Sequence, residues 1–556
     1  MGRWVVCSAW PYVHATPHLG TFLHLLSADV FTRYLRAKGE EVVSVSGSDE
    51  HGTPIEVEAI REGIKPRALT DKQHAAICEL LRRYRIELDN YTRTENPVHI
   101  QFVQDFYRRI YENGYVFTKK VELTYCEKDD LFLPDRFVQG ICPFCKSDGA
   151  RGDQCENCGR VLDSIQLIEP SCVLCGARPT IRSTKHWFFD LPKFSDALRE
   201  YLDSNNQLPN NARNFSYRWI EEGLRPRALT RDSRWGIPAP FPGAEGKTIY
   251  VWMEAVLGYL SATVEWFQRT GKPNQADEFW LDEHTKNVHF IGKDNVPFHI
   301  IIFPALLLAT RRGYVLPWQV SSTEFITFEG QRFSRSHGIG VWIDETLEIA
   351  EPDVWRYVLM AIRPETSDVS FTWELFEQKV NADLNDTLGN FIHRTLTFVE
   401  RFYGGVVPSP RSLGELDEQM MAEIRRIPRI ISDLMDQMRL KVAGEAIIDF
   451  SRRGNQYLNA QEPWRVVKAT PEEAGTVIYV CAQHVRSLAI LLAPFMPSVA
   501  EIIWRQLSLQ GDVHQQRWDS AGELAVRAGH KIGHPEPIFH KVDANEIRSA
   551  LNAKQR

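Results

Sequence analysis

The N-terminal region carries a strand–helix–strand pattern that restricts the fold more than any other part of the chain. Residues 3–9 (RWVVCSA) form a short apolar run with adjacent β-branched valines, which predicts a buried strand. Apolar residues recur at helical spacing from Leu19 to Val30, Gly39 is a plausible helix end, and residues 41–47 (EVVSVSG) predict a second strand. Such a unit implies a parallel sheet with a right-handed crossover.

The turn that leads into the predicted helix is the first candidate binding site. In parallel sheets ligands bind beyond the carboxyl ends of the strands, and Tyr12 and Asp49 fall at such ends. His18 and Gly20 fall at the helix N-terminus, where free backbone N–H groups and the helix dipole favour a phosphate. Alone, the short run from His18 to Thr21 (HLGT) is common by chance, and Asp49 could simply cap a turn.

A second candidate loop spans residues 330–336 (GQRFSRS). It follows a run that looks like the end of the same sheet, and it combines arginines with hydroxyl groups. Most charged loops are merely solvated. The order of the two motifs nevertheless suggests that the folded chain holds a nucleoside triphosphate from two sides.

The cysteines give the strongest signal that does not depend on the fold. Seven of the ten lie between Cys126 and Cys175, and the spacing C-x2-C followed by C-x2-C is typical of a zinc knuckle. We expect a closed structural zinc site without an open catalytic position, with the ligands Cys142, Cys145, Cys155 and Cys158. Disulfides are disfavoured because the sequence shows no secretory signal.

A second metal site is a weaker expectation. Its candidate ligands are Cys126, Asp129, Cys172 and Cys175. The alternative is an interleaved pairing, in which cysteines of the two sets share one ion. The number of zinc ions therefore stays open at this point.

Composition excludes some classes of function. The net charge of −7 gives the chain no overall basic field, which argues against a nonspecific nucleic-acid binder but leaves room for local patches. The apolar stretch at residues 300–309 is too short to span a bilayer, so we expect no membrane partner and a cytoplasmic location. From about residue 374 onward helical periodicity dominates, which predicts an α-helical bundle.

The two candidate loops resemble the signatures of class I aminoacyl-tRNA synthetases. Residues 18–21 resemble their HIGH motif, and residues 332–336 resemble their KMSKS loop. Further motifs, in the expected order over nearly the whole chain, resemble the methionyl-tRNA synthetase family. They are AWPY at 9–12, SDEHGTP at 48–54, FLPDR at 132–136, RDSRWG at 231–236, YVWMEA at 250–255, GKD at 292–294, NQY at 455–457 and PW at 463–464.

The chain departs from both signatures. Thr21 replaces the last histidine of the first motif; it can still donate a hydrogen bond but offers no cation. Arg332 and Arg335 replace the two lysines of the second motif, so the charge is kept while the geometry of phosphate contact changes.

The resemblance implies an α/β fold in which a Rossmann-like catalytic domain precedes an α-helical anticodon-binding domain. The expected segments are 1–115 and 225–325 for the two catalytic halves, 116–224 for a connective insertion with zinc knuckles, 326–373 for the signature loop and stem-contact region, and 374–556 for the anticodon-binding domain. A monomer is expected, because the chain lacks the further C-terminal module that some relatives use to dimerise.

The resemblance also implies the reaction and its partners. Methionine would attack the α-phosphate of ATP to give methionyl-adenylate, with Mg²⁺ bridging the phosphates, and the methionyl group would pass to the 3′ adenosine of tRNA(Met). The residues implied in catalysis are His18, Thr21, Arg332, Ser334, Arg335 and Ser336, and those implied in ATP binding are His18, Gly20, Gly292, Asp294 and Arg335.

The remaining implied sites bind methionine and the anticodon. The methionine pocket would use Ala9, Tyr12, Asp49, Trp252, Ala255, Tyr259 and His299, with Phe303 as a further aromatic wall. Anticodon contacts would come from Asn390, Arg394 and Trp464. The plainer alternatives are a solvated helix face for the first two and a core tryptophan for the third.

Two other functions remain as alternatives. The first is a class I ligase for another amino acid. It is disfavoured because ligases for small apolar side chains need a large editing domain, whereas the insertion here is modest and filled by metal knuckles. The second is a non-catalytic paralogue that binds tRNA, for which the altered signature residues are the only support.

Overall fold

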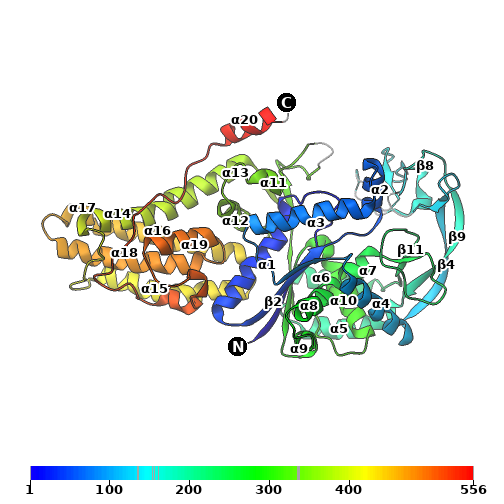
Figure 1. Cartoon of the computed structure of the whole chain (residues 1–556), viewed down its shortest axis with the longest axis horizontal. Coiled ribbons are helices and arrows are strands. Elements are labelled where there is room, and N and C mark those ends of the chain that lie inside the picture. The colour runs from blue at the N-terminus through cyan, green and yellow to red at the C-terminus, as the bar shows by residue number, and fades with distance from the viewer. Residues whose placement is uncertain are drawn as a thin grey trace.

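A parallel sheet forms the centre of the N-terminal half of the protein (Figure 1). The computed structural model describes residues 2–133, 137–152, 155, 157–158, 160, 162–334 and 338–554. Within these residues the strands across the sheet are β14 (Gln319–Thr323), β13 (Lys286–Gly292), β1 (Arg3–Ser8), β2 (Glu41–Ser48) and β3 (Asn90–Arg93), all parallel. Helix α1 (Leu19–Lys38) joins β1 to β2, which confirms the predicted strand–helix–strand unit.

Successive residues of β1 point to opposite faces of the sheet, and helices cover both faces. Val6 packs into one hydrophobic core, whereas Val5 packs into another. The first core includes α1 and α12 (Pro352–Ala361), and the second includes α4 (Pro97–Glu112), α8 (Gly258–Arg269) and α10 (Phe303–Ala309). Burial on both faces explains why this strand reads as a continuous apolar run.

A long antiparallel ribbon of β4 (Val116–Cys126) and β9 (Thr180–Phe189) leaves the sheet domain, at the right of Figure 1. Between these strands lies a small sheet that is built from β6 (Val138–Ile141), β7 (Ala150–Arg151) and β8 (Ile168–Cys172). After the ribbon, α5 (Ser195–Ser204) and α6 (Asn210–Glu221) pack into the second core of the sheet domain. The helical end of the segment 116–224 therefore shares the core of the sheet domain.

Shorter elements complete the N-terminal half. They are α2 (Thr53–Glu62), α3 (Pro66–Arg83), β5 (Leu131–Phe132), β10 (Arg227–Ala228), β11 (Thr230–Arg231), β12 (Thr248–Ile249), α7 (Val251–Ala255), α9 (Gln275–Leu281), β15 (Ile326–Phe328), α11 (Ile343–Thr346) and β16 (Val369–Phe371). The short strand β15 pairs in parallel with β16 just before the second signature loop.

The C-terminal part is a bundle of helices, as predicted (left of Figure 1). Its helices are α13 (Trp373–Gln378), α14 (Asn390–Tyr403), α15 (Glu415–Asp436), α16 (Leu440–Gln461), α17 (Pro463–Val466), α18 (Pro471–Leu492), α19 (Pro497–Gln506) and α20 (Ala544–Lys554). Among the described helices α18 alone is long and apolar enough to cross a membrane, yet 94% of its apolar window is buried inside the protein. It has the composition of a core helix.

Arg356 joins the sheet domain to the bundle. Its guanidinium is fully buried and donates to Asp29 Oδ2 of α1 at 2.6 Å and to the carbonyl of Pro494 at 2.8 Å. It also donates to the carbonyl of Tyr84 at the end of α3, at 3.1 Å. Since its partners come from three segments, this side chain fixes the two domains against each other.

The protein contains buried histidines, which predict that its free energy of unfolding falls in acid. His484 of α18 is fully buried and packs against the rings of Phe391 and Phe450, with centroids 4.7 and 3.7 Å away. Burial lowers the pKa of His484 to about 3 and the pKa of His99 to about 3. On unfolding these rings regain an ordinary pKa, so the unfolded chain binds more protons between that value and about pH 3.

The expected result is a loss of stability as the pH falls below about 6.5, worth about 2 kcal/mol for each such histidine at pH 5. The substitution His484→Leu should remove the part of this loss that comes from His484. It should therefore raise the unfolding temperature, and more at pH 5 than at pH 7. Calorimetric midpoints at pH 7 and pH 5 check this. The exposed His284 supplies the control His284→Leu. Equal acid sensitivity in wild type and His484→Leu would contradict the assignment.

Candidate active site

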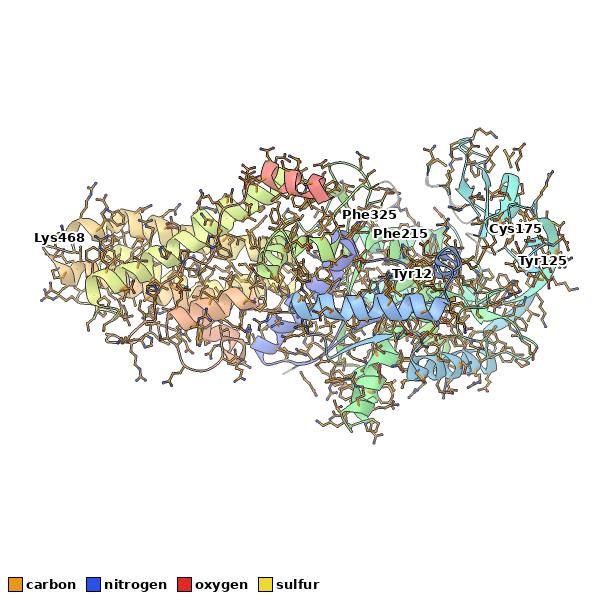
Figure 2. The ribbon with its side chains drawn as sticks, turned by 45° about the horizontal axis from the view of Figure 1, so that its top comes forward. Tyr12, Tyr125, Cys175, Phe215, Phe325 and Lys468 are labelled. Atoms are coloured by element: carbon orange, nitrogen blue, oxygen red, sulfur yellow. The ribbon has the colours of Figure 1, made fainter. Side chains whose placement is uncertain are left out.

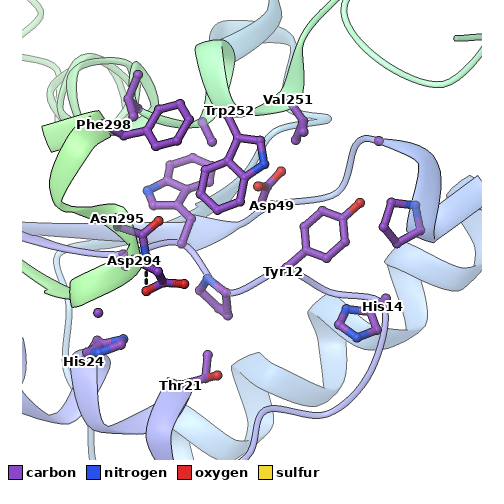
Figure 3. A pocket seen from close by; sticks show the side chains of 18 of the residues that line it. Tyr12, His14, Thr21, His24, Asp49, Val251, Trp252, Asp294, Asn295 and Phe298 are labelled. Atoms are coloured by element: carbon purple, nitrogen blue, oxygen red, sulfur yellow. Dashed lines mark hydrogen bonds between the residues drawn. The ribbon is translucent and has the colours of Figure 1, made fainter. Parts of the chain in front are cut away.

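The main cavity lies at the carboxyl ends of the parallel strands. Strands β1 and β13 are neighbours in the sheet while the chain continues from β1 to β2 on the other side, so the strand order reverses there. Such a switch point is where open α/β sheets bind ligands. A cavity of about 670 Å³ opens at this place, and Figure 3 shows side chains from several strand ends around it.

His18 caps α1 at the floor of the cavity. Its Nδ1 accepts hydrogen bonds from the backbone N–H groups of Gly20 at 3.1 Å and Thr21 at 3.4 Å. Burial, with a smaller effect of His14, lowers the pKa of His18 to about 4, so the ring is neutral at pH 7. A neutral ring whose Nδ1 accepts must carry its proton on Nε2. Nε2 lies 3.3 Å from the hydroxyl of Thr21.

The prediction of free N–H groups at this helix end is therefore wrong for two residues. The amides of Gly20 and Thr21 are satisfied by the side chain of His18, because that ring folds back over the first turn. A Cβ on Gly20 would lie 3.1 Å from Cε1 of His18. Gly20 thus makes room for the imidazole, and the side-chain donor at this point is the Nε2–H of His18, which faces the hydroxyl of Thr21.

Asp49 follows β2 and lines the cavity as predicted (Figure 3). It is only 9% exposed, and its Oδ1 has no hydrogen-bond partner in the described part of the chain. Burial, followed by the nearby carboxylate of Glu254, raises the pKa of Asp49 well above its usual value. A buried carboxyl group with one unpartnered oxygen is suited to receive a cationic ligand group.

Aromatic side chains wall the cavity around Asp49. The ring of Trp252 stacks on that of Phe298 with centroids 4.9 Å apart, and Trp252 and Tyr12 lie on either side of Asp49 in Figure 3. Ala9, Ala255 and Tyr259 line the cavity as well. The predicted wall Phe303 does not; it packs behind Tyr259, with centroids 6.1 Å apart.

His299 also lines the cavity, and its hydrogen bonds fix which ring nitrogen carries the proton. Its Nδ1 lies 3.0 Å from the carbonyl of Asn295, to which it must donate, so its Nε2 accepts from the hydroxyl of Tyr259 at 2.8 Å. Burial lowers the pKa of His299 to about 4. The pair is therefore neutral, and the hydrogen bond between its members is satisfied without a ligand.

Gly292 is the last residue of β13, and Asp294 follows it in a short turn of helix. A Cβ on Gly292 would come within 2.7 Å of Asp294 Oδ1 and 3.4 Å of His24, so a side chain there would collide with the lining. Nε2 of His24 lies 3.0 Å from the hydroxyl of Thr323 at the end of β14. These strand ends form a second, more polar part of the cavity.

The second signature loop contacts the cavity residue His18 through Phe333. Its ring stacks on His18, with centroids 4.5 Å apart and planes within 6° of parallel. Arg332 lies over the ring of Phe325 at 5.8 Å, and the backbone of Ser334 bonds to Ile339 in both directions. Neither Arg332 nor Ser334 is among the described residues that line the cavity. The predicted residues Arg335 and Ser336 lie outside the described residues.

Both predicted cysteine clusters form in space, near the end of the ribbon, where Figure 2 labels Tyr125 of β4 and Cys175 of the turn before β9. In each cluster the ligand atoms lie within 4.8 Å of one another, and the two sets are Cys142, Cys145, Cys155, Cys158 and Cys126, Asp129, Cys172, Cys175. Sγ–Sγ distances such as 3.6 Å between Cys145 and Cys155 fit a tetrahedral zinc, whose sulfur ligands stand about 3.8 Å apart. This geometry favours the sequential pairing over the interleaved one.

Comparison with known proteins decides the family. A sequence model described as "tRNA synthetases class I (M)" matches residues 4–396, and one described as "Anticodon binding domain of methionyl tRNA ligase" matches residues 407–554. The chain is 52% identical to the methionine–tRNA ligase of Thermofilum pendens, over 99% of this chain and 97% of that protein. This chain belongs to the methionine–tRNA ligase family.

Other relatives agree with this assignment. The methionine–tRNA ligase of Korarchaeum cryptofilum is 50% identical over 99% of this chain and 97% of that protein. The crystal structure of Mycobacterium tuberculosis methionyl-tRNA synthetase bound by methionyl-adenylate matches with a TM-score of 0.80 at 24% identity, covering 97% of this chain and all of that chain, which shows the shared fold. The resemblance to methionine–tRNA ligases, the α/β and helical architecture, and the enzyme class are confirmed.

Sequence reasoning missed several residues of this ligase's cavity. Trp10, His24, Trp235 and Phe298 line it, yet none was predicted. Trp10 and Trp235 fall inside motifs that carried the resemblance, so their places in AWPY and RDSRWG were a usable signal. His24 and Phe298 gave no such signal, because each has only the spacing of an ordinary helix residue.

In the bundle of this methionine–tRNA ligase, the three predicted anticodon residues lie near one another. Asn390 and Arg394 share α14, and the guanidinium of Arg394 lies 5.3 Å from the ring of Trp464 in α17. Arg394 donates to Asn459 at 2.9 Å and to Asn455 at 3.4 Å. Trp464 is 40% exposed, which excludes the alternative of a core tryptophan.

Proposed function

We propose that this methionine–tRNA ligase activates L-methionine with ATP to form methionyl-adenylate and pyrophosphate. It then transfers the methionyl group to the 3′ adenosine of tRNA(Met). The observation that carries the proposal is the carboxyl group of Asp49. It is buried in a cavity with aromatic walls that also includes the capped end of α1, and one of its oxygens has no hydrogen-bond partner among the described residues. An ammonium beside Asp49 and a thioether against Tyr12 and Trp252 match the chemistry of methionine.

In this proposal His18 acts on the α-phosphate. Its Nε2–H takes no part in the cap and would turn from the hydroxyl of Thr21 to a ligand, and it stands at the positive end of the α1 dipole. As the methionine carboxylate attacks, negative charge grows on the phosphate oxygens, and a fixed donor there stabilises the transition state more than the ground state. The hydroxyl of Thr21 adds a second polar group at the same point.

The rest of the nucleotide would lie along the strand ends beyond His18. Gly292 leaves room for the sugar, and Asp294 offers a carboxylate beside it. Arg332 and Arg335, with the hydroxyls of Ser334 and Ser336, would cover the leaving pyrophosphate. Mg²⁺ would enter bound to ATP, bridging phosphate oxygens.

We further propose that both cysteine clusters hold structural zinc. Four sulfur ligands close the first site, and three sulfurs with the carboxylate of Asp129 close the second, where Oδ2 lies 3.1 Å from the sulfurs of Cys126 and Cys172. Closed sites stabilise the fold of a segment that has little other core, and they take no part in the chemistry.

Metal analysis tests the two-site assignment. Wild type should contain two zinc ions per chain, and Cys142→Ser with Cys145→Ser should contain one and unfold at lower temperature. Such a site contributes on the order of 10 kcal/mol of binding free energy, so its loss should unfold the knuckle locally. Cys126→Ser with Cys172→Ser should also leave one ion. Cys78→Ser, outside both clusters, is the control. One ion in wild type would disprove the second site.

The anticodon contacts predict a separation of the two reaction steps. Trp464→Ala should remove a stacking surface for an unpaired base and lower kcat/KM for tRNA by about 5- to 150-fold, the equivalent of 1–3 kcal/mol. Methionine-dependent ATP–pyrophosphate exchange should stay unchanged, because the cavity lies in the other domain. Phe402→Ala is a matched control, since Phe402 of α14 is 38% exposed. An equal loss in both variants would contradict a specific stacking role.

The proposed function itself is tested by aminoacylation. The protein should charge tRNA(Met) with methionine in the presence of ATP and Mg²⁺, and should charge it poorly when the anticodon is replaced. Failure to charge tRNA(Met), with exchange intact, would limit the chain to adenylate formation. Efficient charging of a different tRNA would contradict the proposed partner.

A further inference from the structure

His51, two residues after Asp49, is buried between two carboxylates from distant segments. Its Nδ1 contacts Glu254 of α7, and its Nε2 lies 2.7 Å from Oε1 of Glu95. Because each ring nitrogen faces a carboxylate oxygen, both must carry protons, and His51 is an imidazolium. Burial alone would lower the pKa of His51, but Glu254 and Glu95 outweigh it and raise this pKa to about 10.

The neighbouring acids have their own cations. Arg67 donates to Oε2 of Glu95 at 2.5 Å. Arg93 donates to Glu50 at 2.8 Å through its Nε. Both arginines also contact Asp71, whose carboxylate is half exposed, so neither has a positive charge to spare, and His51 is the cation that contacts Glu254.

Three further buried groups beside this cluster are neutral. Burial, with a smaller effect of His51, lowers the pKa of His99 on α4 to about 3. Burial raises the pKa of the Tyr107 phenol on α4 and of the Tyr259 phenol on α8 well above the usual value. None of the three carries charge near pH 7.

Glu254 and Asp49 are the buried acids of this cluster for which the described residues show no arginine partner. Glu254 is fully buried, and its Oε2 has no partner among the described residues, like Oδ1 of Asp49. When both acids are ionised, they face one imidazolium, and the cluster is then one positive charge short. An uncompensated buried charge is costly, so the site favours a ligand that brings a cation.

We propose that His51 and Glu254 are positioning residues that set the charge of Asp49, and that the ammonium of the amino-acid substrate completes this buried cluster. The inference rests on the proposed function, in which Asp49 binds that ammonium. His51 favours the ionised form of Asp49, and Glu254 disfavours it. Neither residue lines the cavity, so both act through Asp49.

This arrangement predicts opposite effects for two isosteric changes. His51→Gln removes the cation, so Asp49 should keep its proton to a higher pH and compete poorly for the ammonium. Glu254→Gln removes the repelling carboxylate, so Asp49 should ionise at a lower pH. Each change should move the midpoint of the pH dependence of methionine binding by about one pH unit or more, which is a tenfold change in affinity at an intermediate pH.

The experiment measures equilibrium binding of L-methionine to the whole protein without ATP, from about pH 5.5 to about pH 8.5, by the fluorescence of the cavity tryptophans. A midpoint shifted up in His51→Gln and down in Glu254→Gln is expected. The ligand control is 4-(methylthio)butanoate, which lacks the ammonium and should not bind more tightly as Asp49 ionises. The exposed His284 supplies the protein control His284→Gln.

A variant that fails to fold and a wrong proposed function each give a result that differs from a wrong inference. If His51→Gln does not fold, Glu254→Gln decides alone, because it leaves His51 paired with Glu95. Wild-type midpoints in the folded variants, with Asp49→Asn binding methionine weakly, would overturn the inference and keep the ammonium site. Normal methionine binding by Asp49→Asn would overturn the ammonium site itself.

Discussion

His18→Ala should lower the rate of methionine-dependent ATP–pyrophosphate exchange by about 10²- to 10³-fold, the usual loss for one preorganised donor to a developing charge. The ring is neutral, its Nδ1 is used by the first turn of α1, and its Nε2–H is what remains for the α-phosphate. The substitution should cost only about 1 kcal/mol of stability through the lost cap. The Michaelis constants should change less than the turnover.

Two further variants separate the cap from the chemistry. His18→Asn supplies another good capping side chain, so it should restore the unfolding midpoint without restoring exchange. His284→Ala removes an exposed histidine and should match wild type in both measurements. Exchange near the wild-type rate in His18→Ala would show that the phosphate is stabilised by other groups.

Asp49→Asn should raise the Michaelis constant for methionine in the exchange reaction by about 10²-fold or more. Truncating one partner of a buried charge pair costs about 2–5 kcal/mol, and the asparagine amide cannot balance the substrate ammonium. The change is isosteric and removes a carboxyl group whose pKa is raised by burial and then by Glu254. We therefore expect the unfolding midpoint to stay level or to rise, as is common when a strained binding group is removed.

Asp282→Asn is the matched control for this change. Asp282 pairs with Arg3 at the surface, so its loss should leave both the Michaelis constant and the unfolding midpoint nearly unchanged. An unaltered Michaelis constant for methionine in Asp49→Asn would rule out the contact between Asp49 and the substrate ammonium, whatever the turnover number.

The sequence predicts the parts of this protein that depend on local patterns. The run of residues 3–9, the helical spacing after Leu19 and the strand at 41–47 reappear as β1, α1 and β2, because each pattern is set by burial of neighbouring positions. The cysteine clusters could be predicted equally well, because a spacing of two residues between cysteines is enough to place both on one ion.

The electrostatics of the site could not be predicted in the same way. The proton position on His18 follows from a cap geometry that sequence does not give. The contact of His51 with Glu254 joins residues that are 203 positions apart. Phe303 was expected to line the cavity and Phe298 was not, because both are aromatic residues on one helical stretch and only their facing distinguishes them.

The most direct test of the account is ATP–pyrophosphate exchange with each standard amino acid in turn on the purified protein. The account predicts exchange with methionine alone, because the ammonium site of Asp49, the aromatic walls and the donor of His18 then act together. Exchange with a different amino acid would keep the fold and contradict the proposed pocket. No exchange with any amino acid, even with tRNA added, would contradict the proposed activity.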